Sequence, residues 1–225
     1  MLGEGVVALG KLTALQARVL GLLSPLSSAW TLTGGGALCG FHLQHRVTRD
    51  LDLFWHGLRA FAREPDACEH LLRQAGLRVD VLQRSPAFVR FRCADSQDAV
   101  LVDLVAEPVP SIEPPTLVAA NDATIRIDTE YEIFVNKLGT LLHRTEMRDL
   151  VDLRALLARG ADLTRGLRDA ATKDRGFSPL MVGHLLAAFP VRKLAEAAGM
   201  PATEAADLDR FRADLAVRVA QVAHP

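Results

Sequence analysis

Two carboxylates, spaced two residues apart, follow a run of three glycines in the N-terminal part of the chain. The glycines are Gly34, Gly35 and Gly36, and the carboxylates are Asp50 and Asp52. Because residues two apart in a β-strand point to the same side, a strand here would present both carboxylates on one face. Mg²⁺ or Mn²⁺, which prefer oxygen ligands, would remove the repulsion between the two charges. The pattern predicts a metal site, and its alternative is a pair of solvated carboxylates on an edge strand.

The three glycines separate an expected strand at residues 29–33 from an expected helix at residues 37–44. Successive backbone N–H groups at such a turn, together with the helix N-terminus, can bind a phosphate. A plain tight turn is the alternative, because glycine also serves wherever φ must be positive. The turn shows neither a GxGxxG fingerprint nor a GK[ST] sequence, so it fits neither a Rossmann fold nor a P-loop. A phosphate turn followed by two carboxylates is the outline of metal-dependent nucleotidyl transfer.

A third carboxylate, Asp103, lies inside the apolar run from Val100 to Val105. A carboxylate in a buried strand is unfavourable unless it is paired with a cation or binds a metal. Asp103 therefore predicts either a further metal ligand or a buried ion pair. The alternative is a strand end that faces a solvent-filled cleft.

Length and composition limit the classes of protein to consider. A chain of 225 residues can form one large domain or two small ones, and 49% apolar with 24% charged residues excludes a disordered chain. The net charge of −1 means that a nucleic-acid partner would need a local basic patch. We expect no membrane segment and no signal peptide, because charges interrupt the long apolar stretches. The three cysteines are odd in number and far apart, which favours a reducing cytoplasm over a disulfide framework.

The elements that must position these residues change in character along the chain. Apolar periodicity predicts helices at residues 4–23, 37–44 and 64–75, and strands at residues 29–33, 50–55, 77–83, 88–93 and 100–105. A cluster of four prolines then predicts a domain boundary at residue 115, and only helices are expected beyond it, at residues 131–144, 148–158, 179–188 and 205–222. The expected fold class is α+β: a small mixed β-sheet head flanked by helices over residues 1–115, followed by a helical domain over residues 116–225.

Blocks of this sequence occur in the same order in a known enzyme family. They are Gly34–Leu38, His45-Arg46, Asp50–Phe54, Asp103, a KLxxLxxR pattern from Lys137 to Arg144, and an RDxxDL pattern from Arg148 to Leu153. In these blocks the chain resembles the AbiEii/AbiGii type IV toxin family of nucleotidyltransferases, a branch of the DNA polymerase β-like superfamily. That family often has Ser or Thr in place of Gly36, with a hydroxyl that can contact a nucleotide phosphate. Thr48 keeps the hydroxyl that the family shows between its Arg and its DxD pair.

The resemblance implies a cytoplasmic nucleotidyltransferase that moves a nucleoside monophosphate from an NTP to a hydroxyl acceptor, such as a tRNA 3′ end, as a toxin with a cognate antitoxin. Asp50, Asp52 and Asp103 would hold Mg²⁺ or Mn²⁺. Lys137 would neutralise triphosphate charge, and Asp149 would be an acid–base or orienting group. The implied nucleotide-binding residues are Gly34, Gly35, Gly36, Arg46, Lys137 and Arg148.

Two other functions stay open at the level of the sequence. A non-catalytic nucleotide- or protein-binding module with a degenerate site is favoured only by Gly36. An antibiotic-type nucleotidyltransferase with a small-molecule acceptor would need an acidic acceptor pocket, and the basic helix pair that begins at Lys137 argues against one. Lys137, Arg144 and Arg148 could also be the polar face of two ordinary helices. The sequence indicates neither the nucleotide, nor the acceptor, nor the oligomeric state.

Overall fold

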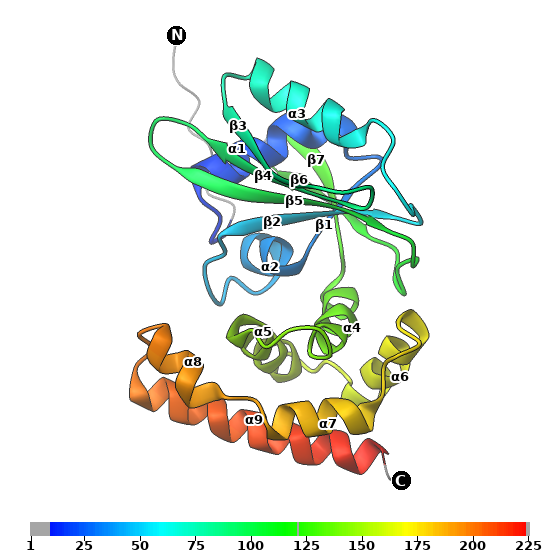
Figure 1. Ribbon diagram of the computed structural model, residues 1–225, viewed down its shortest axis with the longest axis vertical. Helices are drawn as coiled ribbons and strands as arrows, with labels where there is room; N and C mark the ends of the chain where they lie inside the picture. Colours follow the sequence, from blue (N-terminus) through cyan, green and yellow to red (C-terminus); the bar gives the residue numbers. More distant parts are fainter. Residues whose placement is uncertain (1–9, 121, 224–225) are drawn as a thin grey trace. The chain divides into compact units, whose positions relative to one another are not determined.

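A computed structural model divides the chain into two compact units, Met1–Glu130 and Tyr131–Pro225, and describes residues 10–120 and 122–223 (Figure 1). The first unit holds a β-sheet with helices, and the second holds helices. Among the described residues, no helix is both long and apolar enough to cross a membrane. The order of the elements confirms the expected fold class, a mixed-sheet head followed by a helical part.

The first unit is built on a mixed sheet that has seven strands within the described residues. These strands are β1 (Thr31–Thr33), β2 (Asp50–His56), β3 (Arg78–Arg84), β4 (Phe88–Ala94), β5 (Ala99–Glu107), β6 (Thr116–Ala120) and β7 (Ala123–Ile127). They follow the order β3-β4-β5-β2-β1-β7-β6. β2 pairs with β5 in parallel, as does β1 with β7, and the other neighbours are antiparallel. The strand with the carboxylate pair is therefore in the middle of the sheet and not at its edge.

The alternation of side chains along β2 explains how it presents its carboxylates. Leu51, Leu53 and Trp55 are buried, while the residues between them are partly exposed. Burying the apolar set on one face leaves Asp50 and Asp52 on the opposite face, because successive strand residues point to opposite sides. The hydrophobic pattern thus fixes the register of the carboxylates.

Helical segments of the first unit adjoin this sheet. They are α1 (Ala14–Leu23), the 3₁₀ turn η1 (Ser24–Leu26), α2 (Gly34–Ala37), the π-helical turn η2 (Leu38–His42) and α3 (Glu64–Gln74). α1 begins at a capping box, in which the Thr13 hydroxyl accepts from the Gln16 N–H and the Gln16 side chain accepts from the Thr13 N–H. The expected helix at residues 4–23 therefore begins later, and its residues 4–9 lie outside the described part. α2 begins earlier than expected, directly at Gly34.

The strands β6 and β7, which follow the proline cluster in the sequence, pair as a hairpin and belong to the same sheet. β7 returns beside β1, where Ile127 pairs with Leu32. The prolines from Pro108 to Pro115 lie in the connection between β5 and β6 instead of in a linker between domains. The first compact unit therefore ends at Glu130, whereas the prolines predicted a boundary at residue 115.

The second unit is formed by helices. They are α4 (Glu130–Thr140), α5 (Met147–Ala158), α6 (Leu163–Lys173), α7 (Pro179–Ala187), α8 (Val191–Ala197) and α9 (Ala202–Ala223). α9 packs along α7 and also contacts α5 and α8 (Figure 1). Gly166 of α6 lies against Phe134 and Leu138 of α4, where a larger residue would meet the Phe134 ring. Four of these helices match the expected ones, and the sequence did not predict α6 and α8.

Candidate active site

The three carboxylates that the sequence singled out in the first unit lie on one face of the sheet. In the parallel pairing of β2 with β5, Asp52 lies directly beside Asp103, and Asp50 lies beside Leu101. Laterally paired residues of neighbouring strands point to the same side, so Asp50, Asp52 and Asp103 form a row across two strands. We refer to these three side chains as the carboxylate row. The structure thus brings together residues that are about fifty positions apart in the sequence.

Asp103 has a cationic partner on the next strand. Arg90 of β4 pairs with Asp103 of β5, and its Nε and Nη2 donate to Oδ1 and Oδ2 of Asp103 over 2.7 and 2.6 Å. This is the bidentate geometry in which guanidinium–carboxylate hydrogen bonds are strongest. The hydrogen bond to Asp103 raises the pKa of Arg90 despite partial burial, and the charges of Asp103, Asp50 and Asp52 raise it further. Arg90 therefore lies within the electric field of the whole carboxylate row.

The glycine turn lies against the carboxylates with almost no room for a side chain. Gly34 has φ of +58°, and a Cβ built on it would be 2.5 Å from Oδ2 of Asp52. A Cβ on Gly35 would be 2.8 Å from Oγ1 of Thr48 and 2.9 Å from Nη2 of Arg46. Glycine is needed at Gly34 both for the left-handed backbone and for this close approach. The turn therefore places bare backbone beside Asp52, as a phosphate site requires.

Thr48 holds the first carboxylate of the pair. Its hydroxyl donates to Oδ1 of Asp50 over 2.8 Å. Its backbone carbonyl in turn accepts from Nε2 of Gln16 on α1 over 3.0 Å, in a buried hydrogen bond. These two contacts fix the orientation of Asp50 from the loop that precedes β2.

Gly36 differs from Gly34 and Gly35, because a side chain at this position would point into the apolar interior. A Cβ on Gly36 would be 3.0 Å from a methyl group of Leu32 and 3.3 Å from one of Leu51. The side chain of a serine or threonine at this position would therefore leave the backbone on the packed side of the turn and not on the side of Asp52. The lack of a hydroxyl at Gly36 was the one argument for a degenerate site, and the orientation of Gly36 removes that argument.

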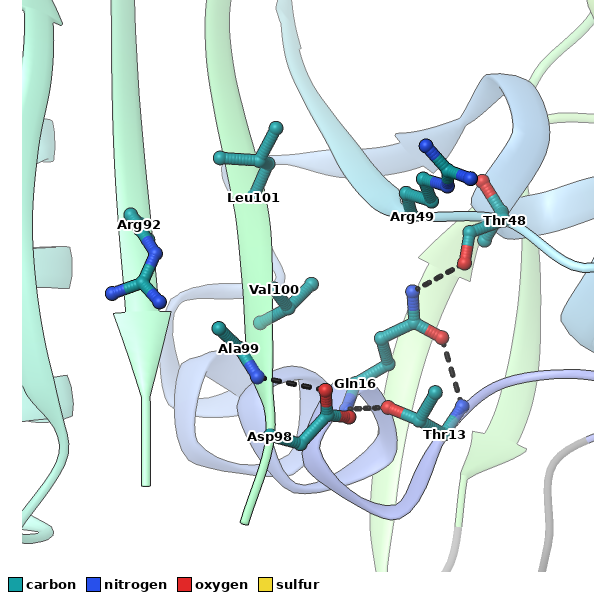
Figure 2. Close-up of a pocket in the computed structure, with 9 residues that line it drawn as sticks. All are labelled: Thr13, Gln16, Thr48, Arg49, Arg92, Asp98, Ala99, Val100 and Leu101. Atoms are coloured by element: carbon teal, nitrogen blue, oxygen red, sulfur yellow. Dashed lines mark hydrogen bonds between the residues drawn. The ribbon is translucent and has the colours of Figure 1, made fainter. Parts of the chain in front are cut away.

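A cavity of about 300 Å³ opens beside the first residues of β2 and β5 (Figure 2). Its lining residues are Thr13, Gln16, Thr48, Arg49, Arg92, Asp98, Ala99, Val100 and Leu101. Because Leu101 is the sheet neighbour of Asp50, the cavity adjoins one end of the carboxylate row. Arg49 and Arg92 line it together with the carboxylate of Asp98, and Leu101 lies between the two arginines (Figure 2).

In the second unit, Lys137 lies between two buried carboxylates. Its Nζ is 2.7 Å from Oδ1 of Asp149 and 2.8 Å from Oδ2 of Asp152. Burial alone would lower the pKa of Lys137, but the charges of Asp152 and Asp149 hold it above its ordinary value. Burial likewise opposes ionisation of Asp149, but the hydrogen bond from Arg144 and the charge of Lys137 hold its pKa below the usual range. Lys137 and Asp149, each expected at the site for its own role, are thus in direct contact as two charged groups.

Arg148, an expected phosphate contact, is directed at a near neighbour in sequence. Its Nη2 donates to Oε2 of Glu146 over 2.7 Å, and its Nε donates to the same oxygen over 3.2 Å. Both side chains are substantially exposed. The carboxylate row and the glycine turn belong to the first unit, and Lys137, Arg148 and Asp149 belong to the second.

Arg90 is the residue at the carboxylate row that the sequence analysis missed. The strand β4 alternates buried Val89, Phe91 and Cys93 with partly exposed residues, including Arg90 and Arg92. This alternation was visible in the sequence and placed both arginines on one face of the strand. It could not show that this face continues into the one that carries Asp103, because that depends on the pairing of β4 with β5.

Comparison with known proteins identifies the family of the chain. Residues 18–220 match the model of the nucleotidyl transferase AbiEii toxin family of type IV toxin–antitoxin systems. MenT4, a nucleotidyltransferase toxin from Mycobacterium tuberculosis, superposes with a TM-score of 0.64 and 18% identity, covering 93% of this chain and 85% of that chain. JHP933 from Helicobacter pylori gives a TM-score of 0.53 and 17% identity, covering 94% and 93%. No curated protein matches the chain. The family match spans most of the sequence, so the chain belongs to the AbiEii nucleotidyltransferase toxin family.

Proposed function

We propose that this nucleotidyltransferase moves a nucleoside monophosphate from an NTP to a hydroxyl acceptor, with a divalent cation held by Asp50 and Asp52. The observation that carries the proposal is the contact of the glycine turn with the carboxylate row, in which the backbone of Gly34 approaches Asp52 more closely than any side chain would allow. A phosphate on this turn would lie beside both carboxylates.

The carboxylates of Asp50 and Asp52 suit Mg²⁺ or Mn²⁺ as a pair of oxygen ligands. Mg²⁺ is commonly held by one or two carboxylates, with substrate phosphates and water filling its other positions. Asp50 and Asp52 supply such a pair. Among the described residues, no group of three or more His, Cys, Asp and Glu side chains is arranged to hold a metal. When bound, the ion would neutralise charge on the phosphates and favour deprotonation of the acceptor hydroxyl.

The residues around the pair would prepare the site for the nucleotide. Thr48 orients Asp50, and Arg46 lies beside Gly35, where it would contact a phosphate on the turn. From the helical unit we propose roles in the reaction for Lys137 and Asp149, whose charges are preserved by their contact with each other. Arg148 remains a proposed phosphate contact.

The acceptor that we propose is an RNA hydroxyl, such as a tRNA 3′ end, and the physiological role is that of a cytoplasmic toxin with a cognate antitoxin. Membership in a type IV toxin family supports the role. The cavity with Arg49 and Arg92 beside Asp50 supports a phosphate-bearing acceptor, because guanidinium groups bind phosphates and stack on bases.

The direct test is transfer of label from each of the four NTPs to total tRNA in the presence of Mg²⁺. We expect transfer that is abolished by EDTA and reduced at least about a hundredfold in Asp50→Asn and Asp52→Asn, since each removes a charged metal ligand. Arg84→Ala is the matched control, because Arg84 forms an exposed ion pair with Asp66 and should retain full activity. Transfer that persists in Asp52→Asn, or in EDTA, would disprove the proposal.

A further inference from the structure

We infer that Arg90 binds a phosphate of the nucleotide and that Asp103 positions Arg90 instead of acting as a third metal ligand. This inference rests on the proposed function and concerns two residues of the same face. It assigns a nucleotide contact to a strand that none of the recognised sequence blocks includes. It also replaces the metal role that the sequence suggested for Asp103.

The pairing geometry decides the role of Asp103. Its side chain is 7% exposed, and each of its two oxygens accepts a short hydrogen bond from Arg90. A cation at Asp103 would have to displace the guanidinium from the oxygens that it occupies. Charge-assisted bidentate pairs of this kind are among the strongest hydrogen bonds of a protein, so displacement would be unfavourable.

The same geometry leaves Arg90 able to bind a ligand. A guanidinium has five N–H donors, and the pairing with Asp103 uses one on Nε and one on Nη2. The side chain is 38% exposed, so that its outer edge is accessible. The ring of Phe88, whose centroid is 5.5 Å from the Cζ of Arg90, further restricts the guanidinium plane. Arg90 is therefore a fixed cation with donors directed away from Asp103.

The register of the strands places Arg90 near the proposed cation site. Asp52 lies directly beside Asp103, whose partner is Arg90, so an ion held by Asp50 and Asp52 would lie close to the guanidinium. A phosphate that bridges the ion and Arg90 would be held from two sides, as in sites where an arginine and a metal share a phosphoryl group.

The test measures metal and nucleotide binding separately on the full chain. Mn²⁺ binding is followed by electron paramagnetic resonance for the wild type and for Asp52→Asn, Asp103→Asn and Arg90→Ala. Binding of the four α,β-methylene NTP analogues is measured by calorimetry at saturating Mn²⁺. Arg84→Ala, which removes an arginine from an exposed ion pair on β3, is the control for both measurements.

We expect Asp52→Asn to lose Mn²⁺ binding, while Asp103→Asn and Arg90→Ala retain it. Arg90→Ala should bind the preferred analogue about ten- to a hundredfold more weakly, the scale of a hydrogen bond to a charged group. Asp103→Asn should show a smaller loss of analogue affinity, and Asp103→Glu should recover part of it. Loss of Mn²⁺ binding in Asp103→Asn, or unchanged analogue affinity in Arg90→Ala, would overturn the inference.

Two outcomes separate this inference from the proposed function. If the wild type binds Mn²⁺ and an analogue but transfers no nucleotide to any acceptor, the proposed function fails while the binding measurements still decide the role of Arg90. If the wild type binds no Mn²⁺, both fail. Should Arg90→Ala not fold, Arg90→Lys replaces it, because a lysine keeps the charge but cannot form the bidentate pair. Weaker analogue binding with intact Mn²⁺ binding in Arg90→Lys would then support the inference, and unchanged analogue binding would reject it.

Discussion

Lys137 and Asp149 form a buried ion pair in the helical unit, with 2.7 Å between Nζ and Oδ1 and exposed fractions of 8% and 0% for their side chains. Asp149 also accepts two hydrogen bonds from Arg144, and Lys137 is shared with Asp152. The four side chains connect α4, the loop after it and α5. Their formal charges cancel, which is why two fully buried aspartates can remain ionised.

Removing Lys137 should therefore destabilise the helical unit. Lys137→Ala leaves Asp149 and Asp152 buried without their shared cation, and breaking a buried pair in this way costs about 3–5 kcal/mol. Urea unfolding followed by circular dichroism would measure the change. Arg210→Ala, which removes an exposed ion pair with Asp207 on α9, should change the free energy of unfolding by less than about 1 kcal/mol. Equal effects of the two substitutions would contradict this account of the network.

The network should also confine its stabilising effect to a window of pH. Folding lowers the pKa of Asp149, so its contribution is present above the ordinary carboxyl pKa of about 3.9 and is lost as the pH falls through the folded value. Folding raises the pKa of Lys137, so its contribution is present below the ordinary ammonium pKa of about 10.4 and is lost as the pH rises through the folded value. Between about pH 5 and pH 9 both partners of the wild-type pair keep their charges, so the contribution of the pair should be lost only outside this window. Urea titrations of the wild type and Lys137→Ala check this: the difference in the free energy of unfolding between the two proteins should be smaller below about pH 3 and above about pH 11 than near neutral pH. An equal difference at all pH values would contradict the account.

The sequence was most informative where a single strand carries both the apolar pattern and the chemistry. Alternation along β2 predicted that Asp50 and Asp52 share a face, because the same alternation buries Leu51 and Leu53. Asp149 and Asp152 could have been paired in the same way, since residues three apart lie on one side of a helix. Both carboxylates reach the same lysine because of the way α5 packs against α4. The periodicity of the sequence gives no information about this packing.

Non-local pairing explains what the sequence did not reveal. The partner of Asp103 depends on the register between β4 and β5, so an ion pair and a metal site were equally compatible with the sequence. The strands β6 and β7 are short and follow a cluster of prolines, and only their place beside β1 shows that they belong to the sheet. Identical glycines likewise carried no sign that Gly36 faces the interior while Gly34 faces Asp52.

Restoring a hydroxyl at Gly36 should not improve nucleotide binding. The side chain in Gly36→Ser would begin within 3.0 Å of Leu32 and 3.3 Å of Leu51, on the packed side of the turn. We expect unchanged or weaker affinity for the NTP analogues and a loss of stability of about 1–3 kcal/mol, the usual effect of burying an unpaired hydroxyl. Calorimetry and urea unfolding measure the two effects. Tighter analogue binding in Gly36→Ser would show that the hydroxyl reaches the phosphate.

Replacing Gly34 should separate backbone strain from damage to the carboxylate row. In Gly34→Ala, the new Cβ would lie 2.5 Å from Oδ2 of Asp52, so this side chain must move. Gly76→Ala is the matched control, because Gly76 has φ of +81° but open space around its Cβ position. Both substitutions should lower stability by about 1–2 kcal/mol through left-handed backbone strain. Only Gly34→Ala should also weaken Mn²⁺ binding and abolish nucleotidyl transfer, and equal activity of the two variants would show that contact between the turn and Asp52 is not required.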